Sequence, residues 1–194
     1  MLSKAKSFPI VLVAPSGTGK TTICEHILKE FPQLKYSVSA TTRMPREGEV
    51  DKIDYYFLSK PVFRAWIKGD KFYEWAEVYG DLYGTPKEPL LQYLNDGYHV
   101  LLDLDIQGAR SIKKVYPGAV CIFITPPSIS ELKVRLLKRG KDSHKVIARR
   151  LKAAELELSH LKEFDYIVVN ECIPATVDKI GAIIVAEECS SRRI

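Results

Sequence analysis

Short runs of apolar residues recur along the chain, and segments with helical periodicity separate them. An apolar run without polar alternation is typical of a strand buried on both faces of a sheet. Four such strands are predicted, at residues 10–13, 100–105, 119–125 and 166–170. Because helical patterns lie between these strands, the sequence predicts an α/β fold with a parallel sheet flanked by helices.

The predicted helices show apolar residues three and four positions apart. In residues 20–30, Ile23, Ile27 and Leu28 fall on one side of the helix. Ser130 is a candidate N-cap for a later helix, because its hydroxyl can accept from a free backbone N–H. The further helices are predicted at residues 89–96, 130–138, 144–161 and 174–188. Residues 36–88 differ from the rest, being rich in Tyr, Thr, Gly and charge, and they predict a β-rich insertion.

Composition places the chain among ordinary globular proteins. Its 194 residues suit one domain, and 46% of them are hydrophobic while 27% are charged. The formal net charge of +5 fits a partner that carries phosphates, but it does not choose between nucleotides, nucleic acid and simple solubility.

Metal clusters and membrane spans have no support in the sequence. The four cysteines lie far apart without a C-x-x-C pair, and the four histidines show no H-E-x-x-H motif. No segment approaches the roughly 20 apolar residues that cross a bilayer. The apolar run at residues 8–13 is shorter than a signal-peptide core. We therefore expect a cytoplasmic protein.

A glycine-rich loop between the first strand and the first helix is the strongest local signal. The loop consists of Ala14, Pro15, Ser16, Gly17, Thr18, Gly19, Lys20 and Thr21. Backbone N–H groups at such a helix start hold phosphate oxygens, Lys20 can reach the β- and γ-phosphates, and the Thr21 hydroxyl can ligate Mg²⁺. A turn that binds nothing is disfavoured by this position between strand and helix. The usual motif has Gly where Ala14 stands, so a methyl group must fit there at negative φ.

Arg43 and Arg46 lie three residues apart beside several hydroxyl side chains, which indicates a second phosphate site. A solvated basic loop is the alternative, and the two arginines alone do not decide between them. Taken alone, Glu74 would be an ordinary surface acid.

The chain resembles the guanylate kinase family over about residues 10–188. The family's monophosphate signature is similar to S-x-S-x-T-T-R-x-P-R-x-G-E followed by D-Y-x-F, and residues 37–49 and 54–57 match it. Further family motifs follow in order at residues 74–76, 83–85, 102–108, 126–128, 135–140, 150–151 and 169–170. Lys52-Ile53 departs from the family, where a Gly often precedes D-Y, and we expect it to alter only a loop.

The resemblance implies a P-loop NTPase core over residues 1–35, 89–126 and 158–194, within a single domain of residues 1–194. It implies that residues 36–88 bind GMP and that residues 127–157 form a helical lid over ATP. A carboxylate such as Glu74 can accept from N1–H and the 2-amino group of guanine, and the Thr85 hydroxyl can donate to O6.

The family's functional residues carry over to matching positions. The implied GMP-binding residues are Ser39, Arg43, Arg46, Tyr55, Glu74, Tyr83, Thr85 and Asp103. The implied ATP-binding residues are those of the glycine-rich loop together with Arg135, Arg139 and Asn170. The implied catalytic residues are Lys20, Arg43, Arg139 and Arg150. Asp105 is expected to hold Mg²⁺ through a water, with a capping role as the alternative.

The activity that the resemblance implies is Mg²⁺-dependent transfer of the ATP γ-phosphate to GMP or dGMP in purine metabolism. Its partners would be ATP and GMP, with no nucleic acid and no membrane, in a monomer or weak homo-oligomer. A kinase for a phosphorylated ribose is one alternative, which would not need Glu74 or Thr85. A non-enzymatic interaction module is another, which would not need the Gly-Lys-Thr sequence or the lid arginines.

Overall fold

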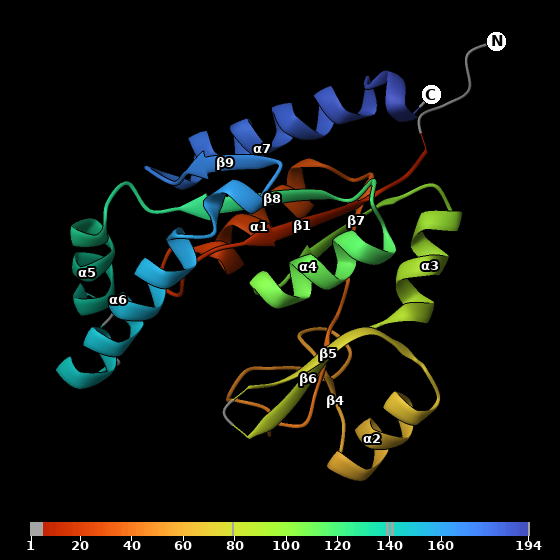
Figure 1. Ribbon diagram of the computed structural model, residues 1–194, viewed down its shortest axis with the longest axis horizontal. Coiled ribbons are helices and arrows are strands. Elements are labelled where there is room, and N and C mark those ends of the chain that lie inside the picture. Colours follow the sequence, from red (N-terminus) through yellow and green to blue (C-terminus); the bar gives the residue numbers. More distant parts are fainter. Residues whose placement is uncertain (1–5, 79, 139, 141, 194) are drawn as a thin grey trace.

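The core of the protein is a five-stranded parallel sheet (Figure 1). The computed structural model describes residues 6–78, 80–138, 140 and 142–193. The strands lie in the order β2-β7-β1-β8-β9. Their bounds are Pro9–Val13 for β1, Leu34–Tyr36 for β2, His99–Asp103 for β7, Val120–Thr125 for β8 and Tyr166–Val169 for β9. The predicted parallel sheet is confirmed. The edge strand β2 was not predicted, because its three residues are too few to show an apolar pattern.

Helices cover both faces of this sheet, which explains the unbroken apolar runs. On β1, Ile10 and Leu12 pack with the apolar residues of α1 and α7, whereas Val11 and Val13 pack with those of α3 and α4. The helix bounds are Lys20–Glu30 for α1, Lys87–Asn95 for α3, Ile106–Val115 for α4 and Ile173–Glu188 for α7. No helix within the described part of the chain is long and apolar enough to cross a membrane.

The predicted strand at residues 100–105 ends two residues too late. The structure ends β7 at Asp103 and uses Asp105 as the N-cap of α4, where its Oδ1 accepts from the Gly108 N–H at 2.8 Å. A capping Asp begins a helix and therefore terminates the extended segment before it. Asp105 therefore caps α4 through one carboxylate oxygen, and its contact with Mg²⁺ through a water stays a prediction.

A second sheet lies apart from the first, below it in Figure 1. It has the strand order β4-β3-β6-β5. Its strands are β3 (Ala40–Thr41), β4 (Tyr56–Phe57), β5 (Phe72–Val78) and β6 (Asp81–Pro86), and helix α2 spans Lys60–Lys68. Phe63 of α2 stacks on Phe72 of β5 with ring centroids 4.5 Å apart. The predicted β-rich insertion is confirmed, but α2 is a helix that the β-rich composition did not predict.

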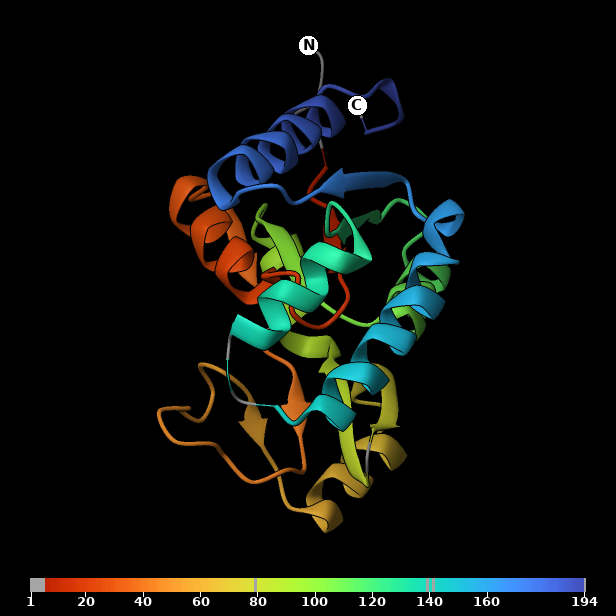
Figure 2. The same cartoon turned by 90° about the vertical axis from the view of Figure 1, so that its left-hand side faces the viewer.

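Helices α5 (Ile129–Lys138) and α6 (His144–Leu158) form a pair beside the carboxyl ends of the core strands (Figures 1 and 2). The predicted N-cap Ser130 is wrong, because Ser130 lies inside α5 and the Ser128 hydroxyl accepts from the Glu131 N–H at 3.0 Å. The predicted extension of α6 to residue 161 is also wrong, since Leu161–Glu163 form a separate 3₁₀ turn.

The carboxyl-terminal segment, which includes a 3₁₀ turn at Ser191–Arg193, is anchored to the core through a buried carboxylate. Glu187 is 5% exposed, and it accepts from the Tyr166 hydroxyl at 2.6 Å and from Arg193 at 2.7 Å. The Arg193 guanidinium also lies over the Phe8 ring, 3.8 Å from its centroid. Burial alone would raise the pKa of Glu187, but the hydrogen bonds from Tyr166 and Arg193 hold it below its ordinary value.

Arg193→Ala is expected to lower the free energy of unfolding by about 2 to 4 kcal/mol, because it leaves a buried carboxylate without its cation. Urea denaturation at neutral pH measures this loss. Since the folded pKa of Glu187 is depressed, the stabilisation is present above the unfolded pKa and is lost as pH falls through the folded pKa. The difference between Arg193→Ala and the parent should therefore shrink in acid.

The control is Arg192→Ala, whose side chain is 80% exposed and lies 3.6 Å from the same carboxylate. An exposed pair of this kind contributes at most about 1 kcal/mol. Equal destabilisation by the two substitutions would contradict the role given to Arg193.

Candidate active site

The glycine-rich loop joins the end of β1 to the start of α1, as the sequence predicts. Gly17 and Gly19 have φ angles of 95° and 98°, a left-handed conformation that favours glycine. A Cβ on Gly17 would lie 2.7 Å from Cδ2 of Leu136 in α5, so the loop and α5 approach closely. Among the described residues other than glycine, only Lys52 and Asp70 have a positive φ. Ala14 therefore has the negative φ that its methyl group requires.

Lys20 contacts the end of the neighbouring strand β7. Its ammonium forms an ion pair with the Asp103 carboxylate and donates to the Leu104 carbonyl at 3.0 Å. Because β1 and β7 are adjacent parallel strands, their carboxyl ends bring these groups to one edge of the sheet, where ligands of open α/β sheets gather. Asp103, an implied GMP-binding residue, thus lies against the loop lysine.

Arg43 is held by a carboxylate that the sequence analysis did not single out. Its guanidinium makes two hydrogen bonds of 2.6 Å to Glu49 and lies 4.9 Å from the centroid of the Tyr55 ring. Hydrogen bonding from Arg43 holds the pKa of Glu49 at about 2. Glu49 also accepts from the backbone N–H of Arg46 at 2.7 Å, so one carboxylate fixes the loop that carries both arginines.

Two tyrosines that the family resemblance implies in GMP binding pack together beside Arg43. The Tyr55 ring packs edge-on against Tyr83, with centroids 6.2 Å apart. Burial raises the pKa of Tyr55, and the charge of Asp103 raises it further, whereas Arg43 and Lys20 lower it. The implied ligand Ser39 lies half-buried just before β3.

The two residues implied to read guanine meet across the β5–β6 pair. Glu74 is in register with Thr85, and the Thr85 hydroxyl donates to Glu74 Oε1 at 2.6 Å. Burial raises the pKa of Glu74, the hydrogen bond from Thr85 lowers it, and the charge of Asp105 raises it. The Thr85 hydroxyl and the Glu74 carboxylate thus lie side by side on one face of the β5–β6 pair.

The helix pair α5–α6 supplies arginines to the same edge of the core sheet. Arg150 lies 3.4 Å from the Ser16 hydroxyl and 3.2 Å from the Asp142 carboxylate. Arg135 donates to the backbone carbonyl of Asn170 at 3.1 Å. Arg139 falls outside the described residues.

Glu157 of α6 is a second carboxylate that the motifs did not indicate. Burial raises its pKa, Lys20 lowers it and Asp105 raises it, so its side chain lies within electrostatic reach of the glycine-rich loop. It lines a small cavity together with Ser16 and Arg150. Helix α6 therefore brings both signs of charge to the loop.

Asn170, at the end of β9, is hydrogen-bonded to the glycine-rich loop. Its Nδ2 donates to the Thr18 carbonyl at 2.6 Å, and its Oδ1 accepts from the Thr176 hydroxyl at 2.9 Å. The side chain is 2% exposed. Both ends of the amide are engaged within the protein, and the contact with adenine stays a prediction.

Few protein groups could ligate a divalent cation. No cluster of three His, Cys, Asp or Glu side chains that could hold a metal occurs among the described residues. The Thr21 side chain is exposed beside the loop, Asp103 is paired with Lys20, and one oxygen of Asp105 caps α4. This set fits Mg²⁺, which keeps several waters and is bound mainly through phosphate oxygens, with one or two protein ligands.

The chain is similar to known proteins over nearly its whole length. The family model described as guanylate kinase matches residues 6–187. Guanylate kinase of Desulfitobacterium hafniense is 48% identical over 184 residues, which cover 95% of this chain and 92% of that protein. Guanylate kinase of Carboxydothermus hydrogenoformans is 44% identical over 189 residues, with coverage of 97% and 93%. The crystal structure of guanylate kinase from Anaplasma phagocytophilum superposes with a TM-score of 0.82 at 34% identity, covering 99% of this chain and 92% of that one.

Proposed function

This chain belongs to the guanylate kinase family and is an ATP:GMP phosphotransferase, and we propose that Lys20, Arg43 and Arg150 act on the phosphates while Glu74 and Thr85 select the base. The observation that carries the proposal is the ion pair between Lys20 of the glycine-rich loop and Asp103 at the end of β7. Asp103 is itself an implied GMP-binding residue, so this ion pair supports an ATP site and a GMP site that meet at the end of β7.

In this proposal the glycine-rich loop holds ATP and the second sheet holds GMP. Backbone N–H groups of residues 14–21 cradle the phosphates of ATP, and Lys20 leaves Asp103 to bind the transferred phosphoryl group. Arg43 and Arg46 bind the GMP phosphate with Tyr55, Tyr83 and Ser39. An oxygen of the GMP phosphate attacks the γ-phosphorus, the bond to the β–γ bridging oxygen breaks, and ADP and GDP leave.

Phosphoryl transfer of this kind depends on positioning and on cations more than on covalent chemistry. Lys20, Arg139 and Arg150 offset the charge that develops on the transferred group. Thr21 and, through water, Asp105 would hold Mg²⁺, which would supply further charge neutralisation on the phosphates of ATP. Closure of residues 127–157 over ATP and of residues 36–88 over GMP would exclude water as a competing acceptor.

We also place the enzyme in the cytoplasm, where its substrates are present, as a monomer or weak homo-oligomer that also accepts dGMP. The assay that tests the proposal is coupled ADP release with ATP, Mg²⁺ and a panel of monophosphates. ADP release should require GMP or dGMP. Comparable turnover with AMP, or with a phosphorylated ribose, would contradict the assignment of Glu74 and Thr85.

Arg150→Ala is expected to lower kcat and kcat/KM together by about tenfold or more, with the KM for ATP nearly unchanged. A charge-assisted hydrogen bond made only in the transition state contributes roughly 1.5 to 3 kcal/mol and appears in kcat. Steady-state kinetics with both substrates varied measure the effect. Lys152→Ala, an exposed residue of the same helix, serves as the control. A rise in KM alone would make Arg150 an ordinary binding residue.

A further inference from the structure

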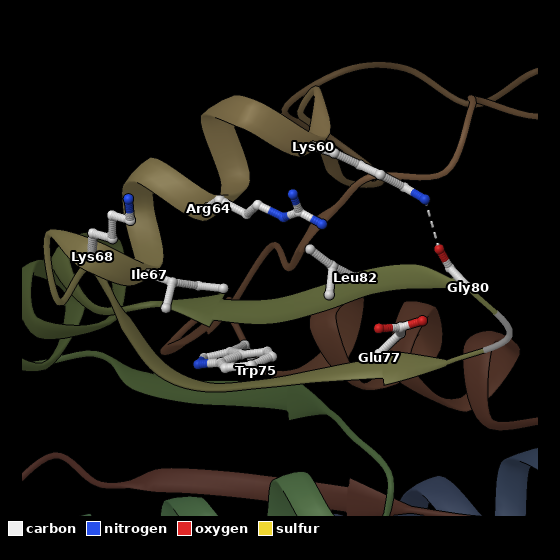
Figure 3. A pocket seen from close by; sticks show the side chains of 8 residues that line it. All are labelled: Lys60, Arg64, Ile67, Lys68, Trp75, Glu77, Gly80 and Leu82. Carbon is white, nitrogen blue, oxygen red and sulfur yellow. Dashed lines mark hydrogen bonds between the residues drawn. The ribbon is translucent and has the colours of Figure 1, made fainter.

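A groove of about 390 Å³ lies on the outer side of the second sheet, between α2 and the β5–β6 hairpin (Figure 3). Its walls are unlike the active site, because α2 supplies cations and the hairpin supplies apolar surface. The lining residues are Lys60, Arg64, Ile67, Lys68, Trp75, Glu77, Gly80 and Leu82. None of them belongs to the machinery proposed for phosphoryl transfer.

The cations of this groove are concentrated on one face of α2. Lys60, Arg64 and Lys68 follow each other at intervals of four residues, a spacing that aligns side chains along a helix. The sequence of α2 contains no acidic residue. Lys60 donates to the Gly80 carbonyl at 2.9 Å, whereas Arg64 and Lys68 form no ion pair with any described residue. Glu77 is the single carboxylate of the lining, against Lys60, Arg64 and Lys68, so cations outnumber anions in the groove.

Trp75 gives the groove a flat aromatic surface. Its side chain is 49% exposed, which is unusual for the largest apolar residue type. The residue opposite Trp75 on β6 is Gly84, which leaves the indole uncovered. A Cβ on Gly84 would lie 3.0 Å from the Glu74 carbonyl oxygen and 3.1 Å from Trp75 Cβ, so a larger residue does not fit there without a shift. The register of the hairpin therefore keeps the indole accessible.

The cations line the α2 wall of the groove from end to end, and the aromatic ring lies at one end of the opposite wall. In Figure 3 Trp75 lies beside Ile67 and Lys68 at one end, and Lys60 lies beside Gly80 at the other, with Arg64 between them. A ligand that uses both ends must carry a flat ring and an anionic chain. Bases stack on exposed aromatic rings, and guanidinium groups bind phosphates bidentately.

We propose that this groove binds a nucleoside polyphosphate, at a site separate from the catalytic one. The base stacks on Trp75, and the phosphates lie against Arg64 and Lys60. A bound nucleotide also contacts the hairpin that carries the guanine readers, because Trp75 and Glu77 alternate with Glu74 along β5. Occupancy should therefore change the KM for GMP. This last consequence rests on the proposed function, whereas binding itself does not.

The test uses the full chain carrying Trp66→Phe, which leaves Trp75 as its single tryptophan. A bisubstrate analogue that joins adenosine and guanosine through five phosphates first saturates the catalytic site. GTP is then titrated while Trp75 fluorescence is recorded. We expect a saturable quench with one site per chain. In this background Arg64→Gln with Lys60→Gln should weaken GTP binding at least about tenfold.

The matched control replaces two exposed lysines outside the groove, Lys29→Gln with Lys179→Gln, and removes the same charge. It should leave the affinity within about twofold of the parent. Thermal melts show that each variant is folded. Inorganic tripolyphosphate, which has the anionic chain without a base, should bind at least about tenfold more weakly than GTP.

Three results would overturn the proposal. One is the absence of a saturable quench, and another is equal loss of affinity in the control pair, which would show a general charge effect. The third is displacement of GTP by a glutamate-rich peptide that binds more tightly than GTP itself, which would assign the groove to an acidic protein partner. Because these readouts do not require turnover, they stay separate from any failure of the proposed phosphotransfer residues.

Discussion

Lys20→Ala is expected to lower kcat by at least about 10²-fold while the protein stays folded. Lys20 is the side chain of the glycine-rich loop whose charge would follow the phosphoryl group as it moves from ATP to GMP. Removing one preorganised cation or donor from a developing anion costs roughly 3 kcal/mol, which corresponds to this loss of rate. Single-turnover kinetics with saturating ATP and GMP measure the chemical step directly.

The structure indicates why this variant should remain folded. The partner of Lys20, Asp103, is 21% exposed at the side chain, so water can solvate its carboxylate once the lysine is gone. The control is Lys29→Ala, which removes an exposed lysine from the other end of the same helix. Near-normal turnover by Lys20→Ala, with an unchanged melting temperature, would remove Lys20 from the catalytic residues.

The elements of the core were predictable because burial on both faces leaves a clear pattern. Strand β1 and helix α1 have the predicted type, and α1 has the predicted bounds. Helices α2 and α4 were not predicted; α2 lies in the segment whose composition indicates strands, and Phe63 is its one buried residue. In α4, the spacing of Ile106, Ala109 and Ile112 and the Asp105 cap could have indicated a helix.

The site was predictable where it depends on local motifs and unpredictable where it depends on tertiary contacts. The glycine-rich loop could be predicted because its motif consists of consecutive residues. The hydrogen bond from Asn170 to Thr18 joins residues 152 positions apart, and no local sequence pattern can indicate a contact over that separation. Glu49 lies within a matched motif, but the motif does not show that Glu49 holds Arg43. The structure shows this through two hydrogen bonds from the Arg43 guanidinium to the Glu49 carboxylate.

Glu74→Gln is expected to lower kcat/KM for GMP by at least about tenfold. The substitution keeps the size of the side chain but removes its charge and one acceptor, and a charge-assisted hydrogen bond contributes roughly 1.5 to 3 kcal/mol. In the parent enzyme, AMP would leave a desolvated carboxylate facing a base edge without its two donors. A site built to pair a polar edge rejects an analogue lacking it by roughly 10⁴-fold, so the parent should prefer GMP strongly.

The protonation of Glu74 makes the same assignment testable by pH. Burial raises the pKa of Glu74, and only the ionised form accepts from both N1–H and the 2-amino group of guanine. The kcat/KM for GMP should therefore fall as pH decreases through this raised pKa. Glu74→Gln has no such group, and its profile should lack that acidic limb. Thr85→Val should weaken GMP more than a 6-deoxo analogue, because it removes the donor to O6.

The control for both measurements is Glu88→Gln, an exposed carboxylate in the first turn of α3, just after β6. It changes the net charge equally and should leave both the preference for GMP and the pH profile unchanged. Base selection by Glu74 requires that the loss of preference and the loss of the acidic limb occur together in Glu74→Gln. If Glu74→Gln keeps the full preference for GMP over AMP, the carboxylate does not read guanine, and the hydrogen bond from Thr85 is then a structural contact within the β5–β6 hairpin.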